Sequence, residues 1–160
     1  MNILYVISGA TGMTGNELVR QILNHGCEKS FVLGFDNFYA SSIETIEDSL
    51  DHKRFKFFEY DLNSEKQMKC IEDYVNKIKN LYDQIIYINC AAVVHTEHFY
   101  HVYETFETNV VGMNNLLNQD IRVGAQKYIK CSTSELYSMN SWNENGGVKE
   151  SDFISMAIAE

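Results

Sequence analysis

The feature that most constrains the fold of this chain is an apolar run near its start that leads into three glycines with the spacing G-x-x-G-x-x-G. Residues 3–7 are apolar or aromatic, and Gly9, Gly12 and Gly15 follow them. An apolar run of this length predicts a buried parallel strand, and glycines let the backbone turn sharply and approach a ligand closely. The helix expected next would point its free N–H groups at an anion. The segment is therefore predicted to hold a pyrophosphate.

A second strand with an acidic residue at its end strengthens this interpretation. Apolar residues recur with helical spacing over 14–25, and a strand at 31–35 then leads into Asp36. An acidic residue about 20 positions after the glycines is where dinucleotide folds place the carboxylate that binds the ribose. A loop that only needs several positive φ angles would show the same glycines, but it would not need this strand–helix–strand context.

Strands and helices alternate along the rest of the chain. Strands are expected at 3–7, 31–35, 55–60, 84–89 and 126–131, and helices at 14–25, 41–51, 64–80 and 100–118. This order predicts an α/β fold, a Rossmann-type doubly wound parallel sheet with right-handed crossovers and helices on both faces. We expect residues 1–160 to form one dinucleotide-binding domain of this type.

Composition and charge narrow the classes of partner. The chain has 160 residues, of which 45% are hydrophobic and 22% charged, so it can bury a core. Its formal net charge of −9 argues against nucleic acids and anionic membranes as partners. No stretch reaches the roughly 18 apolar residues of a membrane span, and no basic region precedes the first apolar run. We therefore expect a cytoplasmic protein.

The cysteines and histidines favour no metal site. The cysteines lie far apart and form no C-x-x-C pair, so reduced core thiols are expected rather than disulfides or zinc ligands. His95, His98 and His101 lie three positions apart with Glu97 between them, and on a helix they would share one face only in part. A metal site there is the less favoured alternative to a loop that enters a solvent-facing helix.

Ligands of open parallel sheets bind beyond the carboxyl ends of the strands, so the residues that follow each strand matter most. Asp61 and Leu62 follow the third strand and suit an adenine edge, and Ala91 and Ala92 follow the fourth and leave space for a ribose or pyrophosphate. Hydroxyls and one carboxylate follow the fifth strand, namely Ser132, Thr133, Ser134 and Glu135. As alternatives, Asp61 could cap a helix near Ser64, the alanines could be ordinary packing, and the hydroxyls could form a capping turn.

These segments together resemble the extended short-chain dehydrogenase/reductases, specifically the NAD-dependent nucleotide-sugar epimerases, dehydratases and decarboxylases. The resemblance covers essentially the whole chain and rests on Gly9-x-x-Gly12-x-x-Gly15, Asp36-Asn37-Phe38-Tyr39, Asp61-Leu62, Asn89-Cys90-Ala91-Ala92, Thr108-Asn109-Val110-Val111-Gly112 with Leu116-Leu117, and Ser132-Thr133-Ser134-Glu135-Leu136-Tyr137. The first and the last of these motifs are the most specific.

The resemblance implies a role for each motif. The pyrophosphate would lie on the glycine loop, against Gly9, Thr11, Gly12, Met13 and Gly15. The adenosine ribose would bind to Asp36 and Asn37, and the adenine would bind to Asp61 and Leu62. The centre of the cleft and the nicotinamide side would be lined by Ala91, Ala92, Asn109 and Ser132. Thr133 would be the active-site hydroxyl.

One feature of the family is absent from the sequence. The resemblance implies a Tyr-x-x-x-Lys pair close to Ile158, in which a tyrosinate takes the proton of the sugar hydroxyl, but no tyrosine follows Tyr137. Asp152 and Met156 could stand in its place in an inactive protein that still binds the cofactor. The favoured alternative is that the chain stops before the pair. The resemblance then implies that residues 1–160 are one NAD-binding Rossmann-type domain that is incomplete at its C-terminal end.

We therefore expect the NAD(P)-binding domain of a nucleotide-sugar epimerase or dehydratase that acts by transient hydride transfer at a sugar carbon. NAD is the expected cofactor, because Asp36 would repel the 2′-phosphate of NADP. Glu135 is expected to remove the acidified sugar proton, with a purely structural role as the alternative. The resemblance implies a nucleotide-sugar substrate and a homodimer. The alternative function is a catalytically inactive NAD-binding or interaction module of the same fold.

Overall fold

A computed structural model describes residues 1–94 and 100–133 of the chain. The chain divides into two compact units, Met1–Lys130 and Cys131–Glu160, and each is treated by itself. The first unit contains a five-stranded sheet with the order β3-β2-β1-β4-β5, in which every pairing is parallel. Its strands are β1 (Ile3–Ser8), β2 (Phe31–Asp36), β3 (Phe55–Glu59), β4 (Gln84–Asn89) and β5 (Lys127–Lys130). The predicted doubly wound Rossmann-type sheet is thus confirmed.

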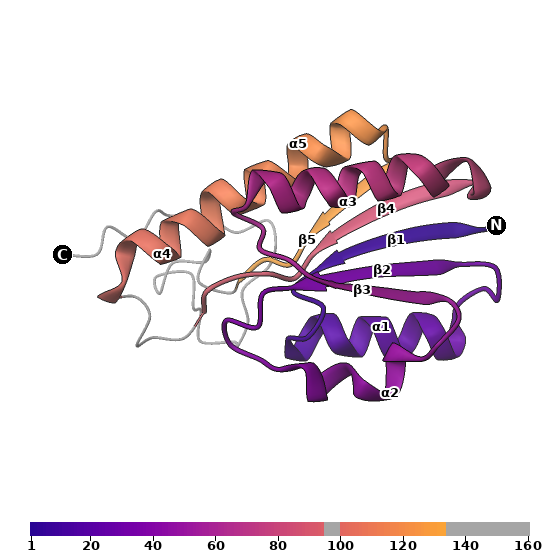
Figure 1. Cartoon of the computed structure of the whole chain (residues 1–160), viewed down its shortest axis with the longest axis horizontal. Helices are drawn as coiled ribbons and strands as arrows, with labels where there is room; N and C mark the ends of the chain where they lie inside the picture. The colour runs from indigo at the N-terminus through magenta and orange to yellow at the C-terminus, as the bar shows by residue number, and fades with distance from the viewer. Residues whose placement is uncertain (95–99, 134–160) are drawn as a thin grey trace, which may run out of the picture. The chain divides into compact units, whose positions relative to one another are not determined.

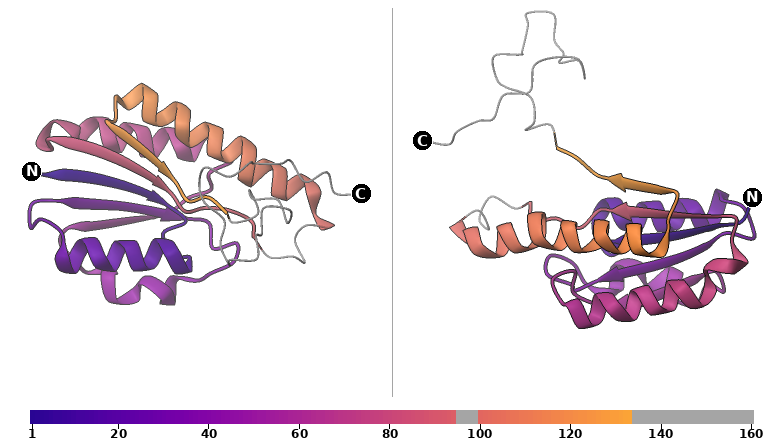
Figure 2. Two further views of the ribbon diagram at one scale, coloured as in Figure 1. Left: turned by 180° about the vertical axis from the view of Figure 1, so that it is seen from behind. Right: turned by 90° about the horizontal axis from the view of Figure 1, so that it is seen from above.

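Helices cover both faces of this sheet (Figure 1). One face carries α1 (Met13–His25), the 3₁₀ turn η1 (Ile43–Ile46) and α2 (Glu47–Leu50). The other face carries α3 (Glu65–Ile78) with the turn η2 (Lys79–Leu81), and a long helix made of α4 (Val102–Phe106), the π-helix η4 (Glu107–Gly112) and α5 (Met113–Val123). Figure 2 shows the same two layers from behind and from above. The reversal of strand order between β1 and β4 opens a crevice at the carboxyl ends of the strands.

Side chains of the central strands alternate between two apolar clusters, one under each helical layer. In β1, Leu4 and Val6 pack with the residues of α3 and α5, whereas Ile7 packs with those of α1. In β4, Tyr87 belongs to the cluster under α3 and α5, and Ile88 belongs to the cluster under α1. Because both faces of a doubly wound sheet are buried, its strands read as continuous apolar runs, and this is why the sequence predicts them well.

The main error in the predicted elements concerns the helix at 100–118. The helix instead continues to Val123 and ends at Gly124, which takes a left-handed φ of 73° as its C-cap. A glycine after the last helical turn is the usual signal for such an end, and the sequence contains it. The predicted strand at 126–131 is also shorter, because β5 spans Lys127–Lys130.

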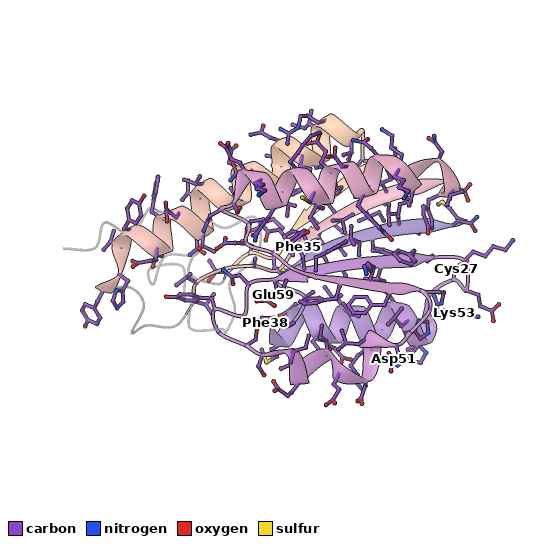
Figure 3. The ribbon with its side chains drawn as sticks, in the orientation of Figure 1. Cys27, Phe35, Phe38, Asp51, Lys53 and Glu59 are labelled. Carbon is purple, nitrogen blue, oxygen red and sulfur yellow. The ribbon has the colours of Figure 1, made fainter. Side chains whose placement is uncertain are left out.

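Two of the four cysteines are not core residues. Cys27 and Cys70 are exposed, so the prediction of a core position is wrong for these two. Figure 3 shows Cys27 at the edge of the molecule that lies opposite Phe38. Cys27 lies in the turn between α1 and β2, and Cys70 lies on α3. No helix among the described residues is long and apolar enough to cross a membrane.

Replacing Asp120 with asparagine should stabilise the fold at neutral pH. Asp120 is only 8% exposed, its Oδ1 has no hydrogen-bond partner among the described residues, and burial raises the pKa of its carboxyl group. The carboxyl is protonated in both the folded and the unfolded state only well below about pH 4, which is close to the pKa of an unfolded aspartate. Above that pH the folded state retains the proton longer, so stability falls as the pH rises through the raised pKa.

We expect Asp120→Asn to raise the free energy of unfolding by about 1 kcal/mol at pH 7 and to have little effect at pH 4. Urea unfolding of the variant and of the unchanged chain at pH 4 and at pH 7 measures the free energy of unfolding under each condition. Asp51→Asn removes an exposed carboxylate and serves as the charge-matched control. Equal effects of the two substitutions at pH 7 would contradict the prediction.

Candidate functional site

Two of the three glycines after β1 are required by the packing of the chain itself. Gly9 has a φ of 70°, and a Cβ at this position would lie 2.6 Å from the nitrogen of Ala91. A Cβ at Gly15 would overlap the carbonyl oxygen of Gly9. These are backbone atoms, which cannot move aside as a flexible side chain can. Gly9 and Gly15 therefore allow the turn after β1, the loop after β4 and the start of α1 to meet.

Gly12 differs from the other two glycines, because the protein leaves room for a side chain there. Its φ is −69°, and a Cβ would meet only the carbonyl oxygen of Gly9, at 3.4 Å, among the described residues. Gly12 is the N-cap of α1 and has no side chain that could accept hydrogen bonds from the first N–H groups, and the first turn of α1 has no acidic residue. Open space beside the N–H groups of a helix start suits an anion.

Thr11 fastens the glycine loop to the segment that follows β2. Thr11 is 1% exposed, and its Oγ1 lies 2.6 Å from the Oγ of Ser41. Its carbonyl oxygen accepts a hydrogen bond of 2.9 Å from the Oγ1 of Thr45. Met13, in contrast, is 91% exposed. The predicted contacts of Thr11 and Met13 with a pyrophosphate stay predictions, and the side chain of Thr11 is already engaged with Ser41.

Asp36, at the end of β2, holds two backbone N–H groups of the crevice. Its Oδ2 accepts from the nitrogen of Thr11 at 3.2 Å, and its Oδ1 accepts from the nitrogen of Phe38 at 2.9 Å. Phe38 has a φ of 58°, and its ring packs 5.6 Å from that of Phe57 between centroids. Figure 3 shows Phe38 close to the end of the sheet that carries the crevice. The carboxylate thus ties the glycine loop to β2, and each oxygen keeps a further lone pair for a ligand.

A second link joins the ends of β2 and β3. The Nδ2 of Asn37 donates to the Oδ2 of Asp61 at 3.2 Å, and the Oδ1 of Asp61 accepts from the nitrogen of Asn63 at 2.7 Å. The N-cap of α3 is Ser64, whose Oγ accepts from the nitrogen of Gln67. Asp61 is therefore not the cap of the next helix, and its carboxylate instead organises the loop after β3.

Three side chains hold the backbone of the loop after β4. The Oδ1 of Asn89 accepts from the nitrogen of Ala91 at 3.0 Å, and the Nζ of Lys130 donates to the oxygen of Ala91 at 3.4 Å. Asn109 makes two bonds with Val93, because its Oδ1 accepts from the nitrogen at 2.7 Å and its Nδ2 donates to the oxygen at 3.0 Å. A loop fixed from β4, β5 and η4 offers a preformed wall to a ligand.

Two hollows meet where these segments come together. One, of about 100 Å³, is lined by Gly9, Gly12, Asp36, Asn37, Tyr39, Ala40, Ser41, Cys90, Ala91 and Ala92. The other is lined by Ser8, Gly9, Phe35, Asp36, Asn37, Tyr60, Leu62 and Ala91. The structure therefore brings seven of the predicted cofactor residues to one crevice, namely Gly9, Gly12, Asp36, Asn37, Leu62, Ala91 and Ala92. Thr11, Gly15, Asp61 and Asn109 lie outside the lining and shape it.

Several residues that line the hollows were not predicted from the sequence. Tyr39, Ala40 and Ser41 follow the acidic end of β2, and Tyr60 directly follows β3. Burial, together with the nearby thiol of Cys70, raises the pKa of Tyr60, so its hydroxyl stays protonated at neutral pH. A hydroxyl residue shortly after Asp36 was the available signal for Ser41, but only the fold shows that this segment turns back toward the glycine loop.

Several predicted residues fall outside this description. Ser132 and Thr133 belong to the second unit, and their part in a shared site stays a prediction. The residues His95, Glu97, His98, Glu135, Asp152 and Met156 lie outside the described ranges. The roles predicted for them also stay predictions.

A larger groove, of about 460 Å³, lies between α3 and α5. Three of its charged groups satisfy one another, because Glu72 accepts from Lys69 at 2.9 Å and from Arg122 at 2.8 Å. It lies between two helices and not at the carboxyl ends of the strands, where ligands of such sheets bind. The crevice of the glycine loop is therefore the better candidate despite its smaller volume.

A parallel sheet with a glycine loop after its first strand and a carboxylate after its second defines a Rossmann-type dinucleotide-binding fold. A family model described as GDP-mannose 4,6 dehydratase matches residues 6–150. The chain belongs to this family, within the nucleotide-sugar epimerases and dehydratases of the extended short-chain dehydrogenase/reductases.

Individual relatives and structures agree with this membership. UDP-glucuronic acid decarboxylase 1 of Arabidopsis thaliana is 32% identical over 133 residues, which are 82% of this chain and 26% of that protein. UDP-glucuronic acid decarboxylase 5 of the same plant is 29% identical over 136 residues, 85% of this chain and 35% of that protein. This chain thus spans about a third or less of the length of these relatives.

Two solved structures show the same fold. The UDP-Glc/GlcNAc 4-epimerase of Campylobacter jejuni superposes with a TM-score of 0.71 at 25% identity, over 92% of this chain and 43% of that chain. The dTDP-glucose 4,6-dehydratase of Bacillus anthracis, solved in complex with NAD, superposes with a TM-score of 0.75 at 20% identity, over 96% of this chain and 44% of that chain.

Proposed function

We propose that this chain is the NAD-binding part of a nucleotide-sugar epimerase, dehydratase or decarboxylase that acts by transient hydride transfer at a sugar carbon. The observation that carries the proposal is the room left at Gly12, in the same hollow as Asp36 and Ala91. The family membership supports it, as do relatives named as nucleotide-sugar decarboxylases and an epimerase. Since the chain spans only part of these relatives, the reaction of a whole enzyme is part of the proposal.

The residues of the crevice would each hold one part of the cofactor. The backbone at Gly12 and the N–H groups at the start of α1 would bind the pyrophosphate. The free lone pairs of Asp36 would accept hydrogen bonds from the adenosine ribose, and Leu62 would lie against the adenine. NAD held by these residues would supply the hydride acceptor for a transient oxidation of a sugar carbon. The loop held by Asn109 would form the wall on the nicotinamide side.

Thr133 and Glu135 complete the proposal as the active-site hydroxyl and the base that removes the acidified sugar proton. The sequence has no tyrosine after Tyr137 to take a hydroxyl proton. We therefore propose that the 160-residue chain binds NAD and does not turn over nucleotide sugars by itself. Turnover of a nucleotide sugar by this chain, followed by chromatography of the sugar product, would overturn that part. A homodimer, implied by the resemblance, and the cytoplasmic location expected from the sequence also belong to the proposal.

Titration calorimetry of the chain with NAD and with NADP tests the cofactor assignment. We expect NAD to bind at least about tenfold more tightly, because a 2′-phosphate would meet the carboxylate of Asp36. A tenfold difference needs only about 1.4 kcal/mol. Two like charges about 4 Å apart near a protein surface repel each other by about 4 kcal/mol. Equal affinities, or tighter binding of NADP, would contradict the role of Asp36. Failure of both ligands to bind would contradict the proposed function itself.

A further inference from the structure

The long helix beside the crevice contains a π-helical turn at the level of the ligand-facing loops. The π-helix η4 lies between α4 and α5, and Figure 2 shows the three segments as one continuous ribbon. A π-helical turn bonds each residue to the fifth one along, which interrupts the regular helical pattern, and such turns occur often at functional sites. The residues of η4 contact both of the loops that wall the crevice.

The first of these contacts reaches the loop after β3. The Nδ2 of Asn63 donates to the Oγ1 of Thr108 at 3.3 Å. The Oδ1 of Asn63 is buried without a hydrogen-bond partner among the described residues, so the bond of its Nδ2 to Thr108 is the hydrogen bond that orients this amide group. A Cβ at Gly112 would lie 2.7 Å from that Oδ1 and 3.1 Å from the Cδ2 of Leu62. The glycine therefore lets the helix approach this loop closely.

The second contact reaches the loop after β4. Asn109, directly after Thr108, makes its two hydrogen bonds with the backbone of Val93. Neighbouring residues of one turn thus hold two loops, of which one contributes Leu62 to the crevice and the other contributes Ala91. Thr108 itself lines neither hollow.

We infer that Thr108 is a positioning residue of the proposed cofactor site, and that it acts through Asn63 to hold the loop with Asp61 and Leu62 against the adenine. The inference rests on the proposed function, because it assigns the loop after β3 to the adenosine half of the ligand. Asp61 accepts from the backbone nitrogen of Asn63, so a shift of Asn63 passes directly to the neighbouring residues. The bond itself joins Asn63 to Thr108 and includes no atom of the loop after β4 or of the glycine loop.

The test compares Thr108→Val, which keeps the shape of the side chain but removes the hydroxyl, with Thr108→Ser, which keeps the hydroxyl. Calorimetric or NMR titration measures the affinity of each variant of the whole chain for NAD, AMP and inorganic pyrophosphate. Thr108→Val should weaken NAD and AMP by about three- to tenfold, which is the effect of one lost hydrogen bond. Pyrophosphate should bind as before, and Thr108→Ser should retain most of the affinity for AMP.

Two further measurements separate positioning from a general loss of stability. Amide hydrogen exchange of residues 61–63 should become faster in Thr108→Val, whereas that of the strands should not change. The double variant with Asn63→Ala should bind AMP no more weakly than Asn63→Ala alone, because both substitutions remove the same link.

The outcomes distinguish the inference from the proposed function. Equal AMP affinity of Thr108→Val and the unchanged chain would overturn the inference, and so would equal weakening of AMP and pyrophosphate. If the unchanged chain binds neither NAD nor AMP, the proposed function fails. Amide hydrogen exchange at residues 61–63 would then still test whether Thr108 positions this loop. Equal exchange rates in Thr108→Val and in the unchanged chain would overturn the positioning role as well.

Discussion

Replacing Gly12 with alanine should leave the chain folded and weaken NAD binding by about a hundredfold. The new methyl group would find ordinary contact with the carbonyl oxygen of Gly9, at 3.4 Å, and the φ of −69° suits alanine. It would, however, occupy the space beside the start of α1 where we place the pyrophosphate. Forcing a methyl group into a closely packed contact costs about 1–3 kcal/mol, and the upper end of this range corresponds to a hundredfold in affinity.

Gly15→Ala supplies the contrast for this experiment. A methyl group there would overlap the backbone carbonyl of Gly9, so we expect the free energy of unfolding to fall by about 3 kcal/mol. Urea unfolding and NAD titration of both variants should therefore separate a binding defect at Gly12 from a folding defect at Gly15. If Gly12→Ala binds NAD as tightly as the unchanged chain, the pyrophosphate does not lie at Gly12.

Replacing Asp36 with asparagine should reduce both stability and the preference for NAD. The carboxylate accepts from Thr11 and from Phe38, one N–H on each oxygen. An asparagine side chain has one oxygen, so its NH₂ group would face one of these donors. Because hydrogen bonds to charged groups contribute about 1.5–3 kcal/mol each, we expect a loss of about 2 kcal/mol in the free energy of unfolding. NAD should bind at least about tenfold more weakly, and NADP should lose less affinity.

Asp51→Asn is the matched control for this prediction. Asp51 is exposed and follows α2, so its substitution removes the same charge without touching the crevice (Figure 3). Stability from urea unfolding and affinity from calorimetry should stay within error of the unchanged chain. An unchanged ratio of NAD to NADP affinity in Asp36→Asn would show that the carboxylate does not select the cofactor.

The sequence determined the architecture and the core of the candidate site. The strands of a doubly wound sheet are buried on both faces, so Leu4, Val6 and Ile7 appear as part of one apolar run that is easily recognised. Parallel strands then bring their carboxyl ends to one edge. This is why Gly12, Asp36 and Ala91, far apart in the chain, could be assigned to one crevice before their contacts were known.

Only the tertiary structure decided how the crevice is held together and which glycine faces a ligand. Three glycines with equal spacing look alike in the sequence, and the proximity of the Gly9 and Ala91 backbones separates the packing glycines from Gly12. The bonds from Asn63 to Thr108 and from Asn109 to Val93 join segments that no local periodicity relates. The periodicity of a sequence predicts which residues of one helix or strand are buried. These hydrogen bonds instead join two different elements, and only the tertiary structure shows which elements lie close together.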